Sequence, residues 1–187
     1  MLIHCGDMFN MFDHSDDGFE KMDEWFAEQD FKLILCIGGN HDFELQRRAS
    51  YVDQPFKNAV YLEDSGYEFE GVHFFGAPWV PELHGQAYFI KAERLAEKWA
   101  SIPQSVDVLI THSPPAGILD VSSKGFGYGC RYLFNDLART KPTIHCFGHV
   151  HNSSGIYKNN KTTYINAALA NTQHQLCHSP YEIELIK

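Results

Sequence analysis

Four short apolar segments of this chain each end in a glycine or threonine that is followed by a side chain able to bind a metal or move a proton. The segments and their endings are Leu2–Cys5 before Gly6-Asp7, Phe31–Ile37 before Gly39-Asn40-His41-Asp42, Val106–Ile110 before Thr111-His112, and Thr143–Phe147 before Gly148-His149-Val150-His151. Apolar runs of this length are typical of strands that are covered on both faces. In open α/β sheets, ligand sites gather at the carboxyl ends of strands, so fragments distant in the sequence can meet there.

The rest of the chain alternates strands and helices early and becomes rich in strands late. We expect helices over Asp17–Gln29, Tyr88–Ala100 and Leu133–Ala138, and a short one after Asp42. We expect further strands over Val60–Glu63, Tyr67–Phe69, Val72–Phe75, Gly155–Lys158, Thr162–Asn166 and Tyr181–Ile186, with turns at Ser65-Gly66 and Gly71. This order predicts an α/β fold with two packed mixed β-sheets flanked by helices. Because no repeat or linker interrupts the sequence, we expect a single domain over residues 1–187.

Charge and cysteine content exclude some classes of protein. The net charge of −9 argues against a broad surface for binding nucleic acid. The five cysteines are odd in number, scattered and without zinc-site spacing, which favours a reducing, cytoplasmic location. No apolar stretch approaches the roughly 20 residues that a membrane-spanning helix needs, so we expect no membrane association.

The candidate metal ligands are Asp7, Asn40, His112, His149 and His151. One carboxylate, one amide oxygen and three imidazoles suit divalent manganese, iron, zinc or nickel better than calcium, which prefers oxygen ligands alone. His149 and His151 are two residues apart and would point to opposite sides of an extended segment. Either the chain turns at Gly148 so that both reach one centre, or the two histidines serve different ions.

The same residues suggest a chemistry. A carboxylate can bridge two ions, and Asp7 is the natural candidate for that position. Two ions about 3.5–4 Å apart would bind a phosphate between them and activate a water molecule. His41 follows Asn40 directly and would protonate the leaving oxygen, and Asp42 would orient its imidazole.

Taken together and in order, the four fragments resemble the calcineurin-like metallophosphoesterase family over most of the chain. Three further motifs resemble the branch with the animal brain metallophosphoesterase-domain proteins, which is known for cyclic-nucleotide phosphodiesterase activity: Gly76-Ala77-Pro78-Trp79, Gly129-Cys130 and Tyr164-Ile165-Asn166-Ala167. The resemblance implies a metallophosphoesterase-like α/β sandwich. It also implies one complete metal site from Asp7, Asn40, His112 and His149, with Asp7 bridging, His151 in a second site, and His41 as the acid.

The sequence departs from the family pattern at its start. Members of the family begin with a strand that carries an Asp-x-His motif, and both of those side chains bind the first metal. This chain starts just before Gly6-Asp7, so we expect the fold to lack that first strand and the second site to be partial. The chain is then either a fragment or a natural short form, which would bind one metal, recruit His4 or His14, or be inactive. An uncovered strand edge would favour a homodimer.

Two functions follow from these patterns. The first is a metal-dependent phosphoesterase that hydrolyses a small phosphodiester or phosphomonoester, such as a cyclic nucleotide. The alternative is a non-catalytic or single-metal scaffold that binds a protein partner through the same fold. Phe126 and Tyr128 either pack within their glycine-rich loop or shape a substrate pocket. His174 and His178 lie in a late polar loop that could border the site, but they are not included in the predicted site.

Overall fold

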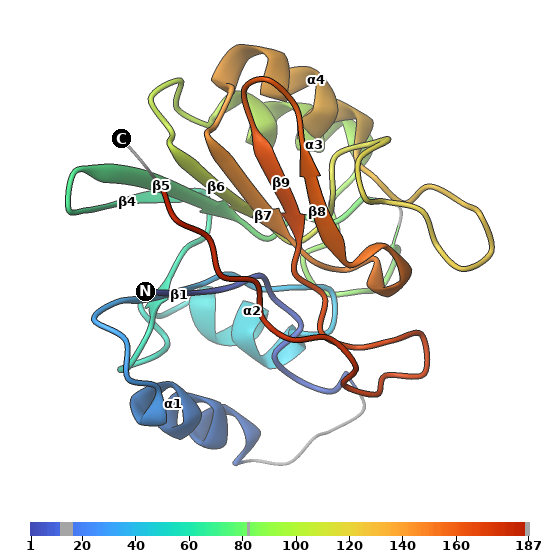
Figure 1. Ribbon diagram of the computed structural model, residues 1–187. Coiled ribbons are helices and arrows are strands. Elements are labelled where there is room, and N and C mark those ends of the chain that lie inside the picture. Colours follow the sequence, from blue (N-terminus) through green and yellow to red (C-terminus); the bar gives the residue numbers. More distant parts are fainter. Residues whose placement is uncertain (12–16, 82, 186–187) are drawn as a thin grey trace.

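The computed structural model describes residues 1–11, 17–81 and 83–185, which form two β-sheets packed face to face with helices on their outer faces (Figure 1). The small sheet has parallel strands in the order β1 (Leu2–His4), β2 (Ile34–Cys36) and β3 (Val60–Tyr61). The large sheet has the order β4-β5-β6-β7-β9-β8. Its strands are β4 (Ser65–Phe69), β5 (Val72–Ala77), β6 (Val108–Thr111), β7 (Ile144–Phe147), β8 (Gly155–Lys158) and β9 (Thr163–Asn166).

The strands in the middle of the large sheet, β5, β6, β7 and β9, run parallel, and β4 and β8 lie antiparallel at its two edges. The helices are α1 (Gly18–Glu28), α2 (Phe43–Ala49), α3 (Ala92–Ala100) and α4 (Arg131–Thr140), with a short 3₁₀ helix η1 (His151–Ser153). The predicted fold class, two mixed sheets flanked by helices, is confirmed. Within the described residues, β1 is an edge strand of the small sheet.

Strand alternation explains the layers, because successive side chains point to opposite faces of a sheet. In and beside β2, Leu35 and Ile37 face the large sheet, whereas Ile34 and Cys36 face α1 and α2. A second apolar layer, which includes Leu109 and Phe147 of the large sheet, lies under α3 and α4. Apolar residues therefore fill three interfaces, and the result is a sandwich of four layers, helix–sheet–sheet–helix (Figure 1).

The predicted helix over Tyr88–Ala100 begins only at Ala92. Tyr88 is fully buried with a φ of 55°, which a right-handed helix does not allow, and its hydroxyl lies 2.8 Å from that of Tyr61. The N–H of Val80 donates to the carbonyl of Tyr88, and the N–H of Ile90 donates to that of Val80. The apolar pattern at the start of this segment therefore belongs to a buried extended stretch.

Two further predictions need correction. Ser65 and Gly66, expected as a turn, are the first residues of β4, and the chain bends just before them at Asp64, whose φ is 48°. The segment 181–185, expected as part of a strand, has no strand pairing; its side chains Tyr181 and Leu185 instead pack against the core between the sheets. Residue 186 of that prediction lies outside the described residues.

His145 in β7 is a fully buried histidine with a defined tautomer. The hydroxyl of Thr111 donates to the carbonyl of Ser113 at 2.8 Å, so it accepts from the Nε2–H of His145, also at 2.8 Å. The other ring nitrogen, Nδ1, is buried and has no hydrogen-bond partner in the described part of the chain. Burial lowers the pKa of His145 to about 3, so the ring is neutral in the folded protein.

We expect His145 to make the fold sensitive to acid. In the unfolded chain it takes up a proton near pH 6.5, whereas in the folded chain it does so near pH 3. The contribution of His145 to the free energy of unfolding is therefore fully present above pH 6.5 and is lost as the pH is lowered. Between pH 7.5 and pH 5 this loss should amount to about 2 kcal/mol. Replacing it by His145→Gln, whose amide can still donate to Thr111, should reduce the fall measured by urea unfolding by about that amount. An identical pH dependence in both proteins would contradict this.

Candidate metal centre

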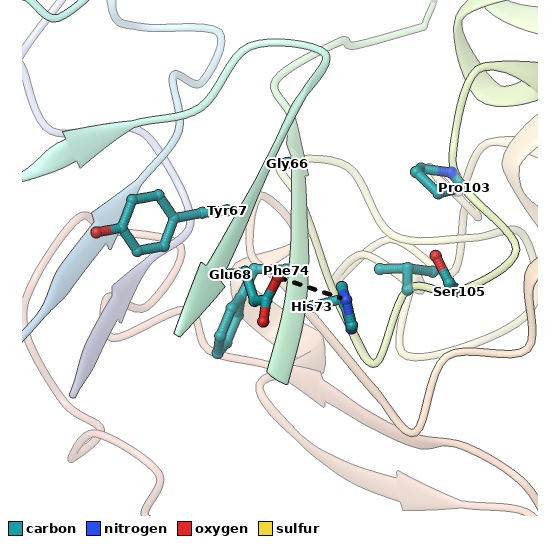
Figure 2. A pocket seen from close by; sticks show the side chains of 8 residues that line it. Gly66, Tyr67, Glu68, His73, Phe74, Pro103 and Ser105 are labelled. Carbon is teal, nitrogen blue, oxygen red and sulfur yellow. Dashed lines mark ion pairs between the residues drawn. The ribbon is translucent and has the colours of Figure 1, made fainter. Parts of the chain in front are cut away.

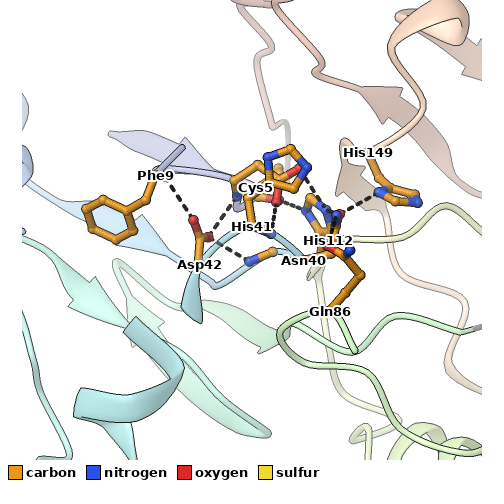
Figure 3. Close-up of polar contacts among 10 residues, drawn as sticks. Cys5, Phe9, Asn40, His41, Asp42, Gln86, His112 and His149 are labelled. Carbon is orange, nitrogen blue, oxygen red and sulfur yellow. Dashed lines mark hydrogen bonds and ion pairs between the residues drawn. The ribbon is translucent and has the colours of Figure 1, made fainter. Parts of the chain in front are cut away.

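The side-chain oxygen of Asn40 is the point where the predicted ligands meet. Asn40 Oδ1 lies 2.9 Å from His112 Nε2 and 2.9 Å from His149 Nδ1, and His112 Nε2 lies 3.4 Å from Asp7 Oδ2. The ligand atoms of Asp7, His112 and His149 are all within 4.8 Å of one another. Figure 3 shows Asn40, His112 and His149 pointing toward one another. The structure thus brings together four of the five predicted metal ligands.

These four residues come from the carboxyl ends of four strands. Asp7 and Asn40 follow β1 and β2 of the small sheet, and His112 and His149 follow β6 and β7 of the large sheet. Because each pair of strands is parallel, its carboxyl ends lie at one edge, as the position rule for α/β sheets predicts. The N–H of Gly148 donates to the carbonyl of His112 at 3.1 Å, which ties the two loops of the large sheet together.

The backbone around the centre is unusual at several positions. A Cβ at Gly39 would lie 2.6 Å from the His112 ring and 2.5 Å from the Asp7 nitrogen, so only glycine fits. Asp7 and His149 have φ values of 58° and 68°, in the left-handed region that residues other than glycine rarely adopt. Such conformations cluster at functional sites. The turn at His149 also separates it from His151, which does not join the four residues.

The ring of His112 is oriented as metal-binding histidines usually are. Its Nδ1–H donates to the carbonyl of Cys5 at 2.8 Å, which leaves Nε2 as the nitrogen that faces Asn40 and Asp7. A histidine that binds a metal commonly donates its other N–H to a carbonyl in this way. This observation, together with a carboxylate, an amide oxygen and a second imidazole nearby, fits a divalent transition-metal ion.

Electrostatics favour a positive charge between these residues. Burial raises the pKa of Asp7, but the charge of His112 and its hydrogen bond outweigh burial and hold that pKa well below its usual range. Burial likewise lowers the pKa of His112, but Asp7 outweighs it and the net shift is upward. Burial, and then the neighbouring His112, lower the pKa of His149 to about 3, so its ring is neutral and keeps a lone pair for a metal.

Asp42 holds the loop backbone in place. Its carboxylate, fully buried, accepts hydrogen bonds from the N–H groups of Asp7 (2.8 Å), Gly39 (2.7 Å) and Phe9 (3.0 Å). Burial and the Asp7 carboxylate raise the pKa of Asp42 to about 7, and the N–H groups of Phe9 and Gly39 oppose this rise. In the described part of the chain no hydrogen bond joins Asp42 to the His41 ring. Asp42 therefore ties the Asp7 loop to the Asn40 loop, a different task from the predicted orientation of His41.

We expect Asp42→Asn to destabilise the fold by about 2–4 kcal/mol. The side-chain NH₂ group of asparagine would face a backbone N–H, and because both groups are donors, that hydrogen bond would be lost. The free energy of unfolding from urea titration measures this. The matched control is Glu44→Gln, the same change two residues later at a partly exposed carboxylate paired with Arg47 and Arg48. It should change stability by less than about 1 kcal/mol. Equal effects of the two substitutions would show that Asp42 has no special structural role.

Gln86 and Ala87 position Asn40 and were not expected from the sequence. The Asn40 side-chain N–H donates to Gln86 Oε1 at 3.4 Å, and the N–H of Ala87 donates to the Asn40 carbonyl at 3.1 Å (Figure 3 shows the side-chain pair). The first contact fixes which end of the amide faces the histidines. Gln86 lies in a loop without motif or periodicity, so no sequence signal points to it.

We expect Gln86→Ala to weaken divalent-metal binding about 10-fold or more, because the Asn40 oxygen would no longer be held toward His112 and His149. Calorimetric titration of the metal-free protein with Mn²⁺ measures the affinity. Gln29→Ala, which removes an exposed glutamine bonded to the carbonyl of Trp25 at the end of α1, is the control and should bind as the wild type does. Unchanged affinity in Gln86→Ala would show that Asn40 needs no such support.

Three more histidines border the centre. The backbone N–H of His41 donates to Asp7 Oδ1 at 2.9 Å, and its ring centroid lies 6.3 Å from that of His174. His151 donates from Nδ1 to the carbonyl of Asn171 at 2.8 Å, and its ring centroid lies 5.4 Å from that of His174. His174, which was not among the predicted site residues, thus has one of them on each side.

His4 and His14 were the two further histidines that a short form of the protein was expected to recruit as ligands. His4 lies in β1 with its ring edge-on to Phe26, at a centroid distance of 6.3 Å, so it faces α1. His14 lies outside the described residues.

A loop that carries two exposed aromatic residues is attached beside His151. The N–H of Val121 donates to Ser153 Oγ at 3.1 Å, and the hydroxyl of Ser153 donates to the Val121 carbonyl at 2.7 Å. In the same loop, Phe126 is 61% exposed and Tyr128 is 48% exposed. About half of each side chain is therefore in contact with solvent.

A shallow pocket of about 280 Å³ lies elsewhere, at the amino ends of β5 and β6 (Figure 2). Tyr67, Glu68, His73 and Pro103 are among its lining residues, and His73 Nε2 lies 3.8 Å from a carboxylate oxygen of Glu68. The candidate centre is at the opposite, carboxyl ends of the strands. The pocket therefore has no part in it.

A model of the calcineurin-like phosphoesterase family matches residues 1–153. The chain belongs to this family. It is 32% identical over 211 residues to Metallophosphoesterase domain-containing protein 1 of Homo sapiens, an alignment that covers 99% of this chain and 64% of that protein. It is 36% identical over 197 residues to a UPF0046 protein of Caenorhabditis elegans, which covers 96% of this chain and 66% of the relative. The chain therefore spans about two thirds of the length of these relatives.

A solved crystal structure that is 17% identical in sequence supports the fold. The two structures superpose with a TM-score of 0.62, and the match covers 88% of this chain and 72% of the other chain. The resemblance predicted from the sequence is confirmed by the family match. The family is one of metal-dependent phosphoesterases, and Asp7, His112 and His149 form a candidate ligand group for a divalent cation. In the described part of the chain, every helix is too short or too polar to span a lipid bilayer.

Proposed function

We propose that this protein hydrolyses a small phosphate ester at the centre formed by Asp7, Asn40, His112 and His149. The observation that carries the proposal is the convergence of two ring nitrogens on the Asn40 oxygen, next to the Asp7 carboxylate. A divalent cation bound there supplies positive charge to the phosphate and activates a water molecule. The residues of the chain would bind and orient this cation, and one of them would supply the proton for the leaving group.

We assign the delivery of that proton to His41. Its backbone N–H is bonded to Asp7 Oδ1, so the residue is fixed at the edge of the centre. Its ring is half-buried and, within the described residues, forms no hydrogen bond, so either ring nitrogen can face a substrate. A proton transferred from the imidazole to the leaving oxygen would stabilise the alkoxide as the ester bond breaks.

We further propose that the substrate is a phosphodiester with an aromatic group, such as a cyclic nucleotide. The exposed rings of Phe126 and Tyr128 lie on the loop that is bonded to Ser153, and such rings can stack on a nucleobase. The net charge of −9 means that the protein as a whole repels an anion, so attraction must come locally from a bound cation and the surrounding histidines.

Turnover of bis(p-nitrophenyl) phosphate and of cyclic AMP in the presence of Mn²⁺ tests the proposal. We expect His41→Ala to lower kcat for cyclic AMP by about 100-fold or more, because the ribose oxygen is a basic leaving group that would lose its proton donor. The effect on bis(p-nitrophenyl) phosphate should be much smaller, because p-nitrophenolate leaves without a proton. Asn40→Ala should lower activity through weaker metal binding, with partial recovery at higher Mn²⁺ concentration.

The control is His73→Ala, which removes an exposed imidazole at the opposite end of the strands and should leave turnover unchanged. Equal background rates in the wild type and all three variants would exclude hydrolysis and favour the scaffold alternative. Turnover of the synthetic diester but not of cyclic AMP would exclude only the proposed substrate.

A further inference from the structure

The ring of Tyr88 occupies the space in which Gly38 would otherwise carry a side chain. A Cβ built on Gly38 would overlap Cε2 and Cζ of the tyrosine and would lie 2.8 Å from its hydroxyl oxygen. The ring is fully buried, so it has no room to move aside. Gly38 does not have a positive φ, and its backbone therefore suits other residues. It is the tyrosine ring, and not the backbone conformation, that limits position 38 to glycine.

Gly38 also touches the loop that carries Asp7. A Cβ on Gly6 would lie 2.5 Å from the carbonyl oxygen of Gly38 and 2.7 Å from its carbonyl carbon. Gly6 directly precedes Asp7, and Gly38 lies two residues before Asn40. The backbones of the two ligand loops are thus in direct contact at Gly38, and Tyr88 packs against that same residue. A shift of Gly38 would change the separation of the two ligands.

The two residues before Tyr88 hold Asn40 itself. Gln86 accepts a hydrogen bond from the side-chain amide of Asn40, and the N–H of Ala87 donates to the Asn40 carbonyl. Three consecutive residues, 86–88, therefore contact the loop of residues 38–40 in three different ways. The tyrosine supplies the apolar contact of this set.

A chain of hydroxyl groups fixes the ring of Tyr88. The hydroxyl of Tyr61 donates to a carboxylate oxygen of Glu63 at 2.7 Å, so its oxygen accepts the proton of the Tyr88 hydroxyl, 2.8 Å away. Burial raises the pKa of Tyr88, which keeps this hydroxyl protonated as the donor. Tyr61 belongs to β3 of the small sheet, the sheet that also carries Asp7 and Asn40. The ring is thus tied to the same sheet as the two ligands.

We propose that Tyr88 is a positioning residue for the metal centre: its ring, packed against Gly38, sets the separation of the Asn40 and Asp7 loops and thereby the affinity for the cation. The proposal rests on the proposed function in that it takes these two side chains as ligands. Tyr88 acts through the backbone of Gly38 and not through contact with the cation.

A size exchange between the two residues tests this by calorimetric titration of the metal-free proteins with Mn²⁺. Tyr88→Leu keeps a buried apolar side chain but removes Cε2, Cζ and the hydroxyl, the three atoms nearest to position 38. In protein that urea titration shows to be folded, it should weaken Mn²⁺ binding about 10-fold or more. Gly38→Ala should also weaken binding, because its methyl group would overlap the ring. The double variant should bind Mn²⁺ more tightly than Gly38→Ala alone, because the methyl group then occupies the space that the ring leaves.

Tyr88→Phe is the milder variant in case the leucine variant does not fold. It keeps the ring against Gly38 and removes only the hydrogen bond to Tyr61, so Mn²⁺ binding should weaken by roughly 2- to 10-fold.

The matched control is Tyr164→Leu, the same change at a buried tyrosine in the same apolar layer. It should lower the free energy of unfolding but leave the Mn²⁺ affinity of the folded protein unchanged. The proposal is overturned if Tyr88→Leu or Tyr88→Phe binds as the wild type does, or if the double variant binds no more tightly than Gly38→Ala. An equal loss of affinity in Tyr164→Leu would overturn it as well.

The wild type separates this proposal from the proposed function. Mn²⁺ binding without any turnover would overturn the proposed hydrolysis and leave the role of Tyr88 standing. A wild type that binds no Mn²⁺ would overturn both.

Discussion

The buried carboxylate of Asp42 is the contact on which the rest of the site depends. It accepts three backbone N–H groups from two loops, those that carry Asp7 and Asn40. With those loops joined, Asn40 can present its oxygen to both histidines of the large sheet, and Gln86 fixes which way its amide turns. A single carboxyl group that is buried from solvent thus joins the two loops of a site whose ligands come from two different sheets.

The sequence predicted the parts of the structure that follow from burial and topology. Continuous apolar runs identified the strands, and the rule that ligands lie at their carboxyl ends brought Asp7, Asn40, His112 and His149 together correctly. Contacts made by loops could not be predicted, because a loop has no periodicity that indicates which way its side chains point. Gln86 was missed for this reason, and His174 was placed in a loop that could border the site but was not included in it. For the same reason, the proximity of Asp42 to His41 in the sequence was a poor guide to what its side chain contacts.

The histidines of this protein show how surroundings determine the behaviour of one side chain. His145 is enclosed by apolar residues with one hydroxyl partner, so it is neutral and structural. His112 faces a carboxylate and has its pKa raised, whereas His149, close by, has its pKa lowered to about 3. These differences arise from burial and from the sign of the nearest charge. Composition alone, which counts eleven histidines, cannot distinguish them.

The division of the ligands between two sheets has a thermodynamic consequence. Asp7 and Asn40 extend from the small sheet, and His112 and His149 extend from the large one, so a cation bound among them links the two halves of the sandwich. Separation of the sheets would release it. By mass action, the melting temperature should then rise with the logarithm of the free metal concentration, and a chelator should lower it. Metal supply would thus regulate the fraction of the protein that is folded.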